Sequence, residues 1–266
     1  MKTGAAYVVC KKRSYCGGLC SNDKKRGEKV AYKLIAFDLD GTLTQHKSKL
    51  EDFNRELLCD LQKKYRCLMV GAGSCERIYK QLGEFPIDII GNYGMQQSKI
   101  ENGKFVLVKN DSYTVDRKFF DETAAELREI TGYTQYAGES VEYHASGAVT
   151  FPLLGTAAKL EDKLHFDPGG EKRRAIYPLV AKAFGDYNCF VGGSSSFDIV
   201  KKQYDKYRAL MAYAAEEGIK KEEILFVGDD FETGGNDEQV KLGGIDCVFV
   251  KDYRQTRHYL QEKNVI

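Results

Sequence analysis

The sequence contains no apolar run long enough to cross a bilayer, and it carries almost no net charge. Its 40 lysine and arginine residues balance 39 aspartate and glutamate residues, which leaves a formal charge of +1. This balance gives no global electrostatic reason to expect a nucleic-acid or membrane partner. A convincing secretory signal is also missing, because the short apolar stretch 5–10 is followed at once by basic residues. We therefore expect a cytoplasmic protein.

Paired cysteine spacing and internal repeats are absent too. Three of the eight cysteines, Cys10, Cys16 and Cys20, cluster near the N-terminus without C-x-x-C spacing. A structural zinc ion needs four ligands as a rule, and no nearby histidine supplies the fourth, so we expect no zinc site there. The other five occur singly in apolar or helical stretches and are expected to be reduced and mostly buried: Cys59, Cys67, Cys75, Cys189 and Cys247.

The first 30 residues differ in composition from the rest of the chain. They hold eight basic residues against two acidic ones, a Gly-Gly pair and no amphipathic period. Residues 1–30 are therefore expected to form a basic, flexible N-terminal extension. A tail that meets an acidic partner is the alternative interpretation.

Residues 31–112 alternate between short apolar runs and amphipathic helices. The runs 34–37, 67–70 and 87–90 are typical of buried strands, and 49–65 and 75–82 are typical of helices. The same alternation resumes over 202–266, with helices at 206–217, 236–242 and 256–262 and strands at 224–227 and 247–250. Helices between apolar strands predict an α/β core with a doubly wound, Rossmann-like, mostly parallel sheet.

The intervening residues 113–201 follow another pattern. Helices are predicted at 115–131 and 172–184, and each precedes a predicted hairpin, at 140–152 and 189–201. This order indicates an α+β module with an antiparallel sheet, inserted into a discontinuous core. With 266 residues, the chain is long enough for two such domains.

The most informative segment is Phe37-Asp38-Leu39-Asp40-Gly41-Thr42-Leu43-Thr44, which directly follows the first apolar strand. A strand end places Asp38 and Asp40 at the rim of the sheet, where open α/β folds bind their ligands. A carboxylate such as that of Asp38 can attack phosphorus, and the carboxyl of Asp40 can deliver and remove protons. Because two close carboxylates repel, a divalent cation such as Mg²⁺ is the expected third component.

Three further segments carry candidate residues. Ser74 ends the second strand, where its hydroxyl can hold a phosphate oxygen or simply cap a helix. Lys206 opens a helix and can neutralise a phosphoryl group, with Lys201 and Lys202 as competitors. Asp229 and Asp230 follow the strand 224–227 and complete an oxygen-rich metal site beside Asp38.

Together these segments resemble the four motifs of the haloacid dehalogenase superfamily. The similarity is greatest to the eukaryotic-type phosphomannomutase family, and the Cof-type sugar phosphatases share the core and the cap class. The segments that carry it are Gly73-Ser74, Asn92-Tyr93-Gly94, 192–198, Tyr204-Asp205-Lys206-Tyr207-Arg208 and Gly234-Gly235-Asn236-Asp237. The resemblance covers nearly the whole chain from about Tyr32. It implies that 31–112 and 202–266 form the catalytic core and that 113–201 form its cap.

The resemblance implies an aspartyl-phosphate mechanism. Asp38 would be the nucleophile and Asp40 the acid/base, while Ser74, Gly73 and Lys206 would bind the phosphoryl oxygens. Mg²⁺ would be bound by Asp38, Asp229 and the Asp40 carbonyl. Asp230, Asn236 and Asp237 are expected to support the metal indirectly.

The departures from the phosphomannomutase pattern concern a second phosphate. That family grips it in the cap with arginines, but the matching positions here hold His144, Thr156 and Lys163, and no arginine lies between Arg128 and Arg173. A further family arginine matches Lys47. The residues that match the sugar-hydroxyl contacts, Ser196 and Asp198, are retained.

These departures favour a phosphohydrolase over a mutase. We expect a small phosphorylated metabolite, such as a sugar phosphate, as the substrate. A phosphomannomutase and a non-catalytic binding protein on the same fold remain the alternatives. A homodimer formed through the cap is implied by the family only.

Overall fold

The computed structural model describes residues 31–266. The predicted N-terminal extension and its three cysteines lie outside these residues. Of the remaining cysteines, Cys67, Cys75 and Cys189 are buried, as expected, Cys247 is half-buried, and Cys59 is exposed.

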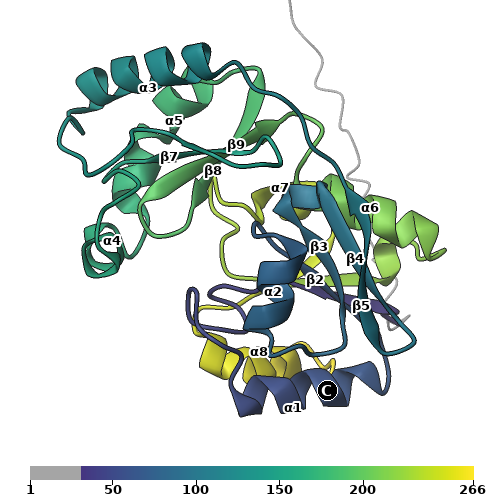
Figure 1. Ribbon diagram of the computed structural model, residues 1–266. Helices are drawn as coiled ribbons and strands as arrows, with labels where there is room; N and C mark the ends of the chain where they lie inside the picture. Colours follow the sequence, from purple (N-terminus) through teal and green to yellow (C-terminus); the bar gives the residue numbers. More distant parts are fainter. Residues whose placement is uncertain (1–30) are drawn as a thin grey trace, which may run out of the picture. The chain divides into compact units, whose positions relative to one another are not determined.

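The larger of two sheets has seven strands in the order β11-β10-β1-β2-β3-β4-β5 (Figure 1). The strands β1 to β3, β10 and β11 run parallel, and β4 and β5 pair antiparallel at one edge. Their bounds are β1 Leu34–Phe37, β2 Arg66–Val70, β3 Asp88–Gly91, β4 Gln96–Glu101, β5 Lys104–Asn110, β10 Ile224–Gly228 and β11 Asp246–Phe249. This arrangement confirms the predicted doubly wound, mostly parallel core.

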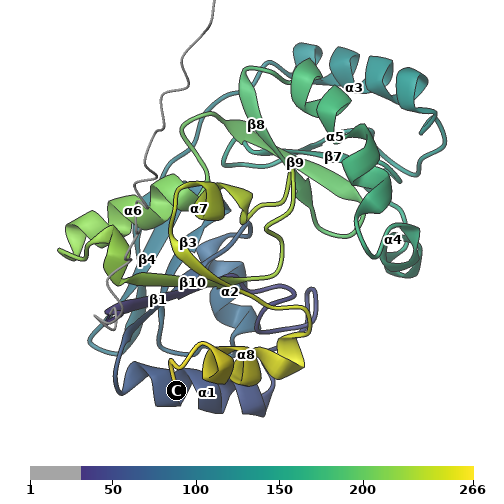
Figure 2. The ribbon, with the colours of Figure 1, turned by 180° about the vertical axis from the view of Figure 1, so that it is seen from behind.

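Helices cover both faces of this sheet, as Figure 2 shows. Helices α1 (Asp52–Gln62), α2 (Cys75–Gln81) and α8 (Thr256–Glu262) pack on the face that contains Ile35 and Phe37. Helices α6 (Lys206–Glu216) and α7 (Glu238–Leu242) pack on the face that contains Leu34 and Ala36. All four side chains of β1 are therefore buried, which explains its uninterrupted apolar sequence.

The second sheet is antiparallel, with the strand order β6-β7-β9-β8. Its strands are β6 Glu142–Tyr143, β7 Val149–Pro152, β8 Tyr187–Gly192 and β9 Ser196–Lys201. Helices α3 (Arg117–Thr131) and α5 (Glu171–Ala183) bury Phe120, Leu127 and Val180 against it. The predicted α+β cap with an antiparallel sheet is thereby confirmed. The exact boundaries at 112/113 and 201/202 stay a prediction.

Two parts of the architecture were not predicted. The antiparallel β4–β5 hairpin was left without assignment, and so was the short helix α4 (Leu160–Phe166), which buries no residue. Three single 3₁₀ turns complete the elements described: η1 (Asn92–Gly94), η2 (Lys221–Glu223) and η3 (Tyr253–Gln255).

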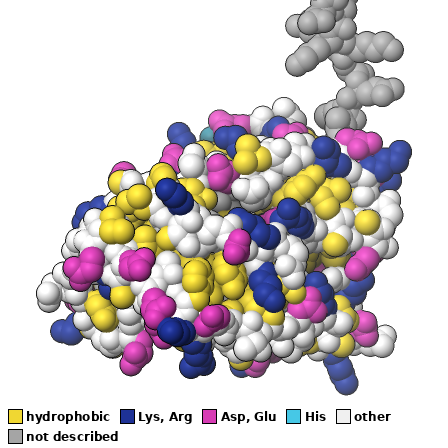
Figure 3. All heavy atoms as spheres, turned by 90° about the horizontal axis from the view of Figure 1, so that it is seen from above, with side chains coloured by type: hydrophobic (Ala, Val, Ile, Leu, Met, Phe, Trp, Pro, Cys, Tyr) yellow, Lys and Arg dark blue, Asp and Glu magenta, His cyan; other side chains and the backbone are white. Residues whose placement is uncertain are grey.

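The surface shows no concentration of one charge on the face drawn in Figure 3, where coloured acidic and basic side chains are interspersed. Over residues 31–266, no helix combines the length and the hydrophobicity that a membrane span requires.

Candidate active site

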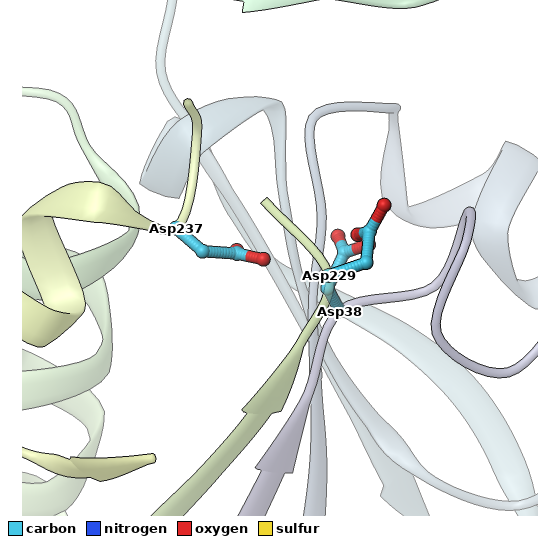
Figure 4. A group of neighbouring side chains, drawn as sticks. All are labelled: Asp38, Asp229 and Asp237. Carbon is cyan, nitrogen blue, oxygen red and sulfur yellow. The ribbon is translucent and has the colours of Figure 1, made fainter. Parts of the chain in front are cut away.

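Three carboxylates meet at the carboxyl edge of the parallel sheet. Asp38 follows β1, Asp229 follows the neighbouring strand β10, and Asp237 precedes α7 and points toward the other two (Figure 4). One carboxylate oxygen from each residue lies within 4.8 Å of the others. The parallel pairing of β1 with β10 explains this convergence, because it brings both strand ends to one edge.

Lys206 provides the counter-charge at the centre of this cluster. Its side chain is completely buried, and its Nζ donates to Asp38 Oδ1 at 2.6 Å and to Asp237 Oδ1 at 2.7 Å. A third bond of 2.8 Å goes to Asn236 Oδ1. Burial alone would lower the pKa of Lys206, but the Asp237 and Asp38 carboxylates outweigh burial and raise it. Of the three candidate lysines, Lys206 is therefore the one that contacts Asp38.

The charge of the cluster fits a divalent cation. Three carboxylates and one ammonium group leave a net charge of −2 when all are ionised. Without a cation, burial and the neighbouring Asp38 raise the pKa of Asp229 well above its ordinary value, and burial raises the pKa of Asp237 to about 7. Carboxylate oxygens are the ligands that Mg²⁺ prefers, so the donor set suits this ion.

Glycines make room for these carboxylates. A Cβ added at Gly41 would overlap the side chain of Asp229, and one added at Gly228 would overlap that of Asp237. Gly41 also has a φ of +93°, a conformation that L side chains rarely adopt. Gly41 is thus required both by its backbone conformation and by the lack of room for a side chain beside Asp229.

Asp40 lies beside the cluster, with its carboxylate held by the core. Its Oδ1 accepts from the backbone N–H of Lys47 at 2.8 Å and from Gln81 Nε2 at 2.7 Å. The guanidinium of Arg77 is 3.4 Å from Oδ2. Burial raises the pKa of Asp40, but Arg77, Gln81 and the Lys47 N–H together hold it below its ordinary value.

Ser74 caps helix α2 and lines the cavity described below. Its Oγ accepts from the Arg77 backbone N–H at 3.2 Å, which is ordinary N-cap geometry. Since the hydroxyl proton is not used in that bond, it is available for a phosphate oxygen. The two functions considered for Ser74 are therefore compatible.

The cluster opens into a cavity of about 1130 Å³ that core and cap residues line together. Among its lining residues are Asp38, Asp40, Gly73, Ser74, Asp229, Asp230 and Asn236 from the core motifs. The five predicted substrate-binding residues, Lys47, His144, Lys163, Ser196 and Asp198, line it as well. The structure therefore brings the predicted residues around one cavity, with Lys206 buried behind Asp38; their roles stay predictions.

Polar side chains on the cap side of this cavity form hydrogen bonds with nearby groups of the cap itself. Lys163 Nζ donates to the Thr156 carbonyl at 3.2 Å, and Ser196 Oγ donates to the Gly192 carbonyl at 3.1 Å. The Thr156 hydroxyl oxygen accepts from the Glu139 N–H at 2.9 Å. No arginine from the cap lines the cavity within the described residues.

A hydrogen-bonded chain links the cap to the core across Asp198. Its Oδ2 accepts from Tyr93 Oη at 2.8 Å, and its Oδ1 accepts from Thr150 Oγ1 at 3.1 Å. The hydroxyl group of Thr150 has one proton and donates it to Asp198. The Nε2 of His144, 2.9 Å from Thr150 Oγ1, must therefore be the donor in the contact between these two residues. Burial and the Asp198 carboxylate raise the pKa of Tyr93 far above its ordinary value, which keeps the phenol a donor.

A second link joins the cap to the loop that carries Asp229. Arg174 of α5 forms ion pairs with Asp230 and, at 3.1 Å, with Glu232. The Val191 N–H donates to the Gly234 carbonyl at 2.8 Å. Asp230, which was expected to support the metal, is thus engaged by a cap arginine, while Asp237, given the same expected role, lies within the carboxylate cluster itself.

No family model matches the chain, but the chain is similar to several known proteins in sequence and in structure. It is 24% identical over 222 residues to a probable phosphomannomutase of Caenorhabditis elegans, covering 78% of this chain and 85% of that protein. It is 26% identical over 219 residues to the phosphomannomutase of Saccharomyces cerevisiae, covering 78% and 84%. Among solved structures, the IMP-bound IMP-nucleotidase of Plasmodium falciparum aligns with a TM-score of 0.62 at 16% identity, covering 90% and 69%.

The comparisons thus support a relationship to the phosphomannomutases in sequence and a haloacid dehalogenase-like fold. Because the sequence identity to that structural neighbour is low, the structural likeness establishes the fold and nothing more specific. Fold and relationship together support a phosphoryl-transfer enzyme.

Four residues of this candidate site were not identified from the sequence. Arg77 and Gln81 both contact Asp40 and also contact each other. Tyr93 and Thr150 contact Asp198. The spacing of four between Arg77 and Gln81, on the helix that Ser74 starts, was an available signal. Tyr93 lies in the Asn92-Tyr93-Gly94 segment that carries the resemblance, but its contact with Asp198, 105 residues away, had no local signal. Thr150 had none either, since Asp198 is 48 residues away from it.

Proposed function

We propose that the protein is a Mg²⁺-dependent phosphohydrolase that acts on a small phosphorylated metabolite, a sugar phosphate, through an aspartyl-phosphate intermediate. The observation that carries this proposal is the Lys206-bound Asp38 beside Asp40, at the base of a cavity whose cap side has no arginine among the residues described.

The mechanism follows from the placement of these groups. A carboxylate oxygen of Asp38 attacks phosphorus, the phosphorus–oxygen ester bond breaks, and the leaving oxygen takes a proton from the carboxyl of Asp40. Water then attacks the aspartyl phosphate while Asp40 accepts its proton, and inorganic phosphate leaves with Asp38 regenerated. Lys206 and the Ser74 hydroxyl hold phosphoryl oxygens and offset their charge.

The metal would be held by Asp38, Asp229 and either the Asp40 carbonyl or Asp237. When bound, Mg²⁺ would neutralise charge on the phosphoryl oxygens and position the phosphate. The net charge of the carboxylate cluster supports this assignment.

The choice of hydrolysis over mutase chemistry rests on the cap. A mutase must hold a second phosphate, and arginine binds phosphate with two parallel donors. Here His144 is engaged with Thr150, and Lys163 is engaged with a backbone carbonyl. Asp198 and Ser196, which match the sugar-hydroxyl contacts of the related family, line the same cavity, and this supports a polyol substrate.

Phosphomannomutase activity is the second candidate, because the sequence relatives carry that name. A non-catalytic binding protein is a weaker third candidate, since every residue that the proposed chemistry requires lines the cavity or contacts Asp38.

A steady-state screen with Mg²⁺ tests these candidates. Phosphate release is followed from hexose and polyol phosphates, and mannose 1-phosphate with a bisphosphate activator is assayed in parallel for mannose 6-phosphate. Phosphate release without isomer formation is the expected result. Isomer formation that outruns phosphate release would replace the hydrolase with the mutase, and neither product would favour a binding protein.

The carboxylate of Asp229 is expected to contribute directly to metal affinity. Asp229→Asn should raise the Mg²⁺ concentration needed for half-maximal activity by at least about 10-fold, because it removes an anionic ligand. Calorimetric Mg²⁺ titration of the same variant measures the loss without relying on turnover. Asp246→Asn, distant from the cluster, is the control, and an unchanged Asp229→Asn titration would contradict the assignment.

Arginines placed in the cap should move the chemistry toward the mutase. His144→Arg, Thr156→Arg and Lys163→Arg combined are expected to raise the ratio of isomer formed to phosphate released, because they offer bidentate donors to a second phosphate. Leu160→Arg adds charge to α4 outside the cavity and serves as the control. A ratio that stays constant would mean that these three positions do not correspond to the cap arginines of the mutases.

A further inference from the structure

The two oxygens of Asp40 differ in their surroundings. Oδ1 accepts two short hydrogen bonds, from the Lys47 N–H and from Gln81 Nε2, so both of its in-plane lone pairs are used. Among residues 31–266, the hydrogen-bond partner of Oδ2 is Arg77, with both Nη atoms at 3.4 Å, a separation longer than a strong charge-assisted bond. Oδ2 is therefore the oxygen that can carry a proton to and from a substrate.

The amide of Gln81 determines how Oδ1 is held. Its Nε2 donates to Asp40 Oδ1 at 2.7 Å and to Thr44 Oγ1 at 3.0 Å. Its Oε1 accepts from Arg77 Nη1 at 2.8 Å. If the amide were reversed, the acceptor Oε1 would face the Asp40 carboxylate, and the donor NH₂ would face the Arg77 guanidinium, so both hydrogen bonds would be lost. The guanidinium of Arg77 thus fixes the orientation of the Gln81 amide.

Arg77 occupies a position from which it acts on both residues. It lies one turn before Gln81 on α2, and its guanidinium fills the space beside Gly73 that a side chain would otherwise occupy. Among residues 31–266, its ion-pair partner is Asp40. Its side chain is 42% exposed, so it is not required for the core packing.

We propose that Arg77 is a positioning residue that holds the Gln81 amide, so that Gln81 fixes Asp40 through Oδ1 and leaves Oδ2 to exchange the proton with the leaving oxygen. This inference rests on the proposed function, in which Asp40 protonates the departing group. In this role Arg77 acts through Gln81, while its own guanidinium lies 3.4 Å from Oδ2.

Proton delivery matters only for leaving groups that need it. A sugar alkoxide is a poor leaving group and requires a proton in the transition state, whereas 4-nitrophenolate is a stable anion and departs without one. A residue that only supports the fold, or only binds phosphate, would affect both esters equally. A residue that positions Asp40 would affect the alkyl ester selectively in the step that forms the aspartyl phosphate, whereas the later hydrolysis step is common to both esters.

The test compares kcat and KM for 4-nitrophenyl phosphate and 2-glycerol phosphate in full-length variants with Mg²⁺. Arg77→Ala and Gln81→Ala are expected to lower kcat/KM, which reports the steps up to the aspartyl phosphate, by roughly 10- to 100-fold for the alkyl ester and by less than about 3-fold for the aryl ester. Asp40→Asn should show the same selectivity more strongly. Arg77→Lys should recover part of the loss, and Glu76→Gln, exposed on the same helix, is the matched control.

The outcomes separate this inference from the proposed function. Equal losses for both esters in Arg77→Ala, with the selective pattern kept in Asp40→Asn, would overturn the role of Arg77 alone. Absence of the selective pattern in Asp40→Asn would overturn the proposed acid and, with it, this inference. Side-chain amide NMR gives a second measure: the Gln81 resonances should move toward free-amide positions in Arg77→Ala, and unmoved resonances would also overturn the inference.

Discussion

Asp38→Asn should abolish turnover while the fold stays intact. The amide lacks the negative charge with which Asp38 attacks phosphorus, yet it matches the carboxylate in shape and can still accept the bond from Lys206. We expect phosphate release to fall by at least about 1000-fold, in line with the removal of other enzymatic nucleophiles. Steady-state kinetics and trapping of acid-stable phosphoprotein measure this loss.

The control for this variant is Asp60→Asn, which changes a surface carboxylate paired with Lys63 and Arg257. It should retain wild-type kinetics, and both variants should give the circular dichroism spectrum of the wild type. Asp38→Asn activity near that of wild type would remove Asp38 as the nucleophile, and with it the aspartyl-phosphate intermediate.

Lys206→Met should both inactivate the protein and destabilise it. The substitution leaves the buried carboxylates of Asp38 and Asp237 without their cation. Breaking a buried ion pair in this way costs about 3–5 kcal/mol of unfolding free energy. Urea denaturation in the absence of Mg²⁺ measures the cost. Added Mg²⁺ should recover part of it, because a ligand that binds only the native state stabilises that state.

A double variant isolates the electrostatic part of this effect. Asp237→Asn added to Lys206→Met removes one of the unpaired charges, so the pair should be less destabilised than the sum of the single variants. Strict additivity would show that Lys206 stabilises the fold through the packing of its side chain rather than through charge.

The sequence was sufficient to predict the core of the site because local pattern and sheet geometry agree there. Asp38 and Asp229 each follow an uninterrupted apolar strand, and parallel pairing necessarily brings such ends to one edge. Lys206 was harder, since Lys201 and Lys202 offered the same charge nearby. The family resemblance favoured Lys206, and the packing of α6, which buries Lys206 completely, now separates it from them in the structure.

What the sequence did not reveal depends on contacts that are distant in the chain or on short elements. Tyr93 meets Asp198 across 105 residues, and no local pattern encodes that pairing. The β4–β5 hairpin was missed although Asn102-Gly103, both with positive φ, is a two-residue turn that favours such hairpins. Helix α4 was missed because it has only 7 residues and buries none of them, so its leucine pair, Leu160 and Leu164, is too short a pattern to indicate a helix.

The glycines at 41 and 228 extend the site to positions that never meet a substrate. At each of them a carboxylate of the proposed site fills the volume of a missing methyl group, so alanine there would displace Asp229 or Asp237. A diverged homologue that retains every acidic residue is therefore expected to lose catalysis through a glycine-to-alanine substitution at either position. The two smallest residues are thus as informative about retained activity as the charged ones.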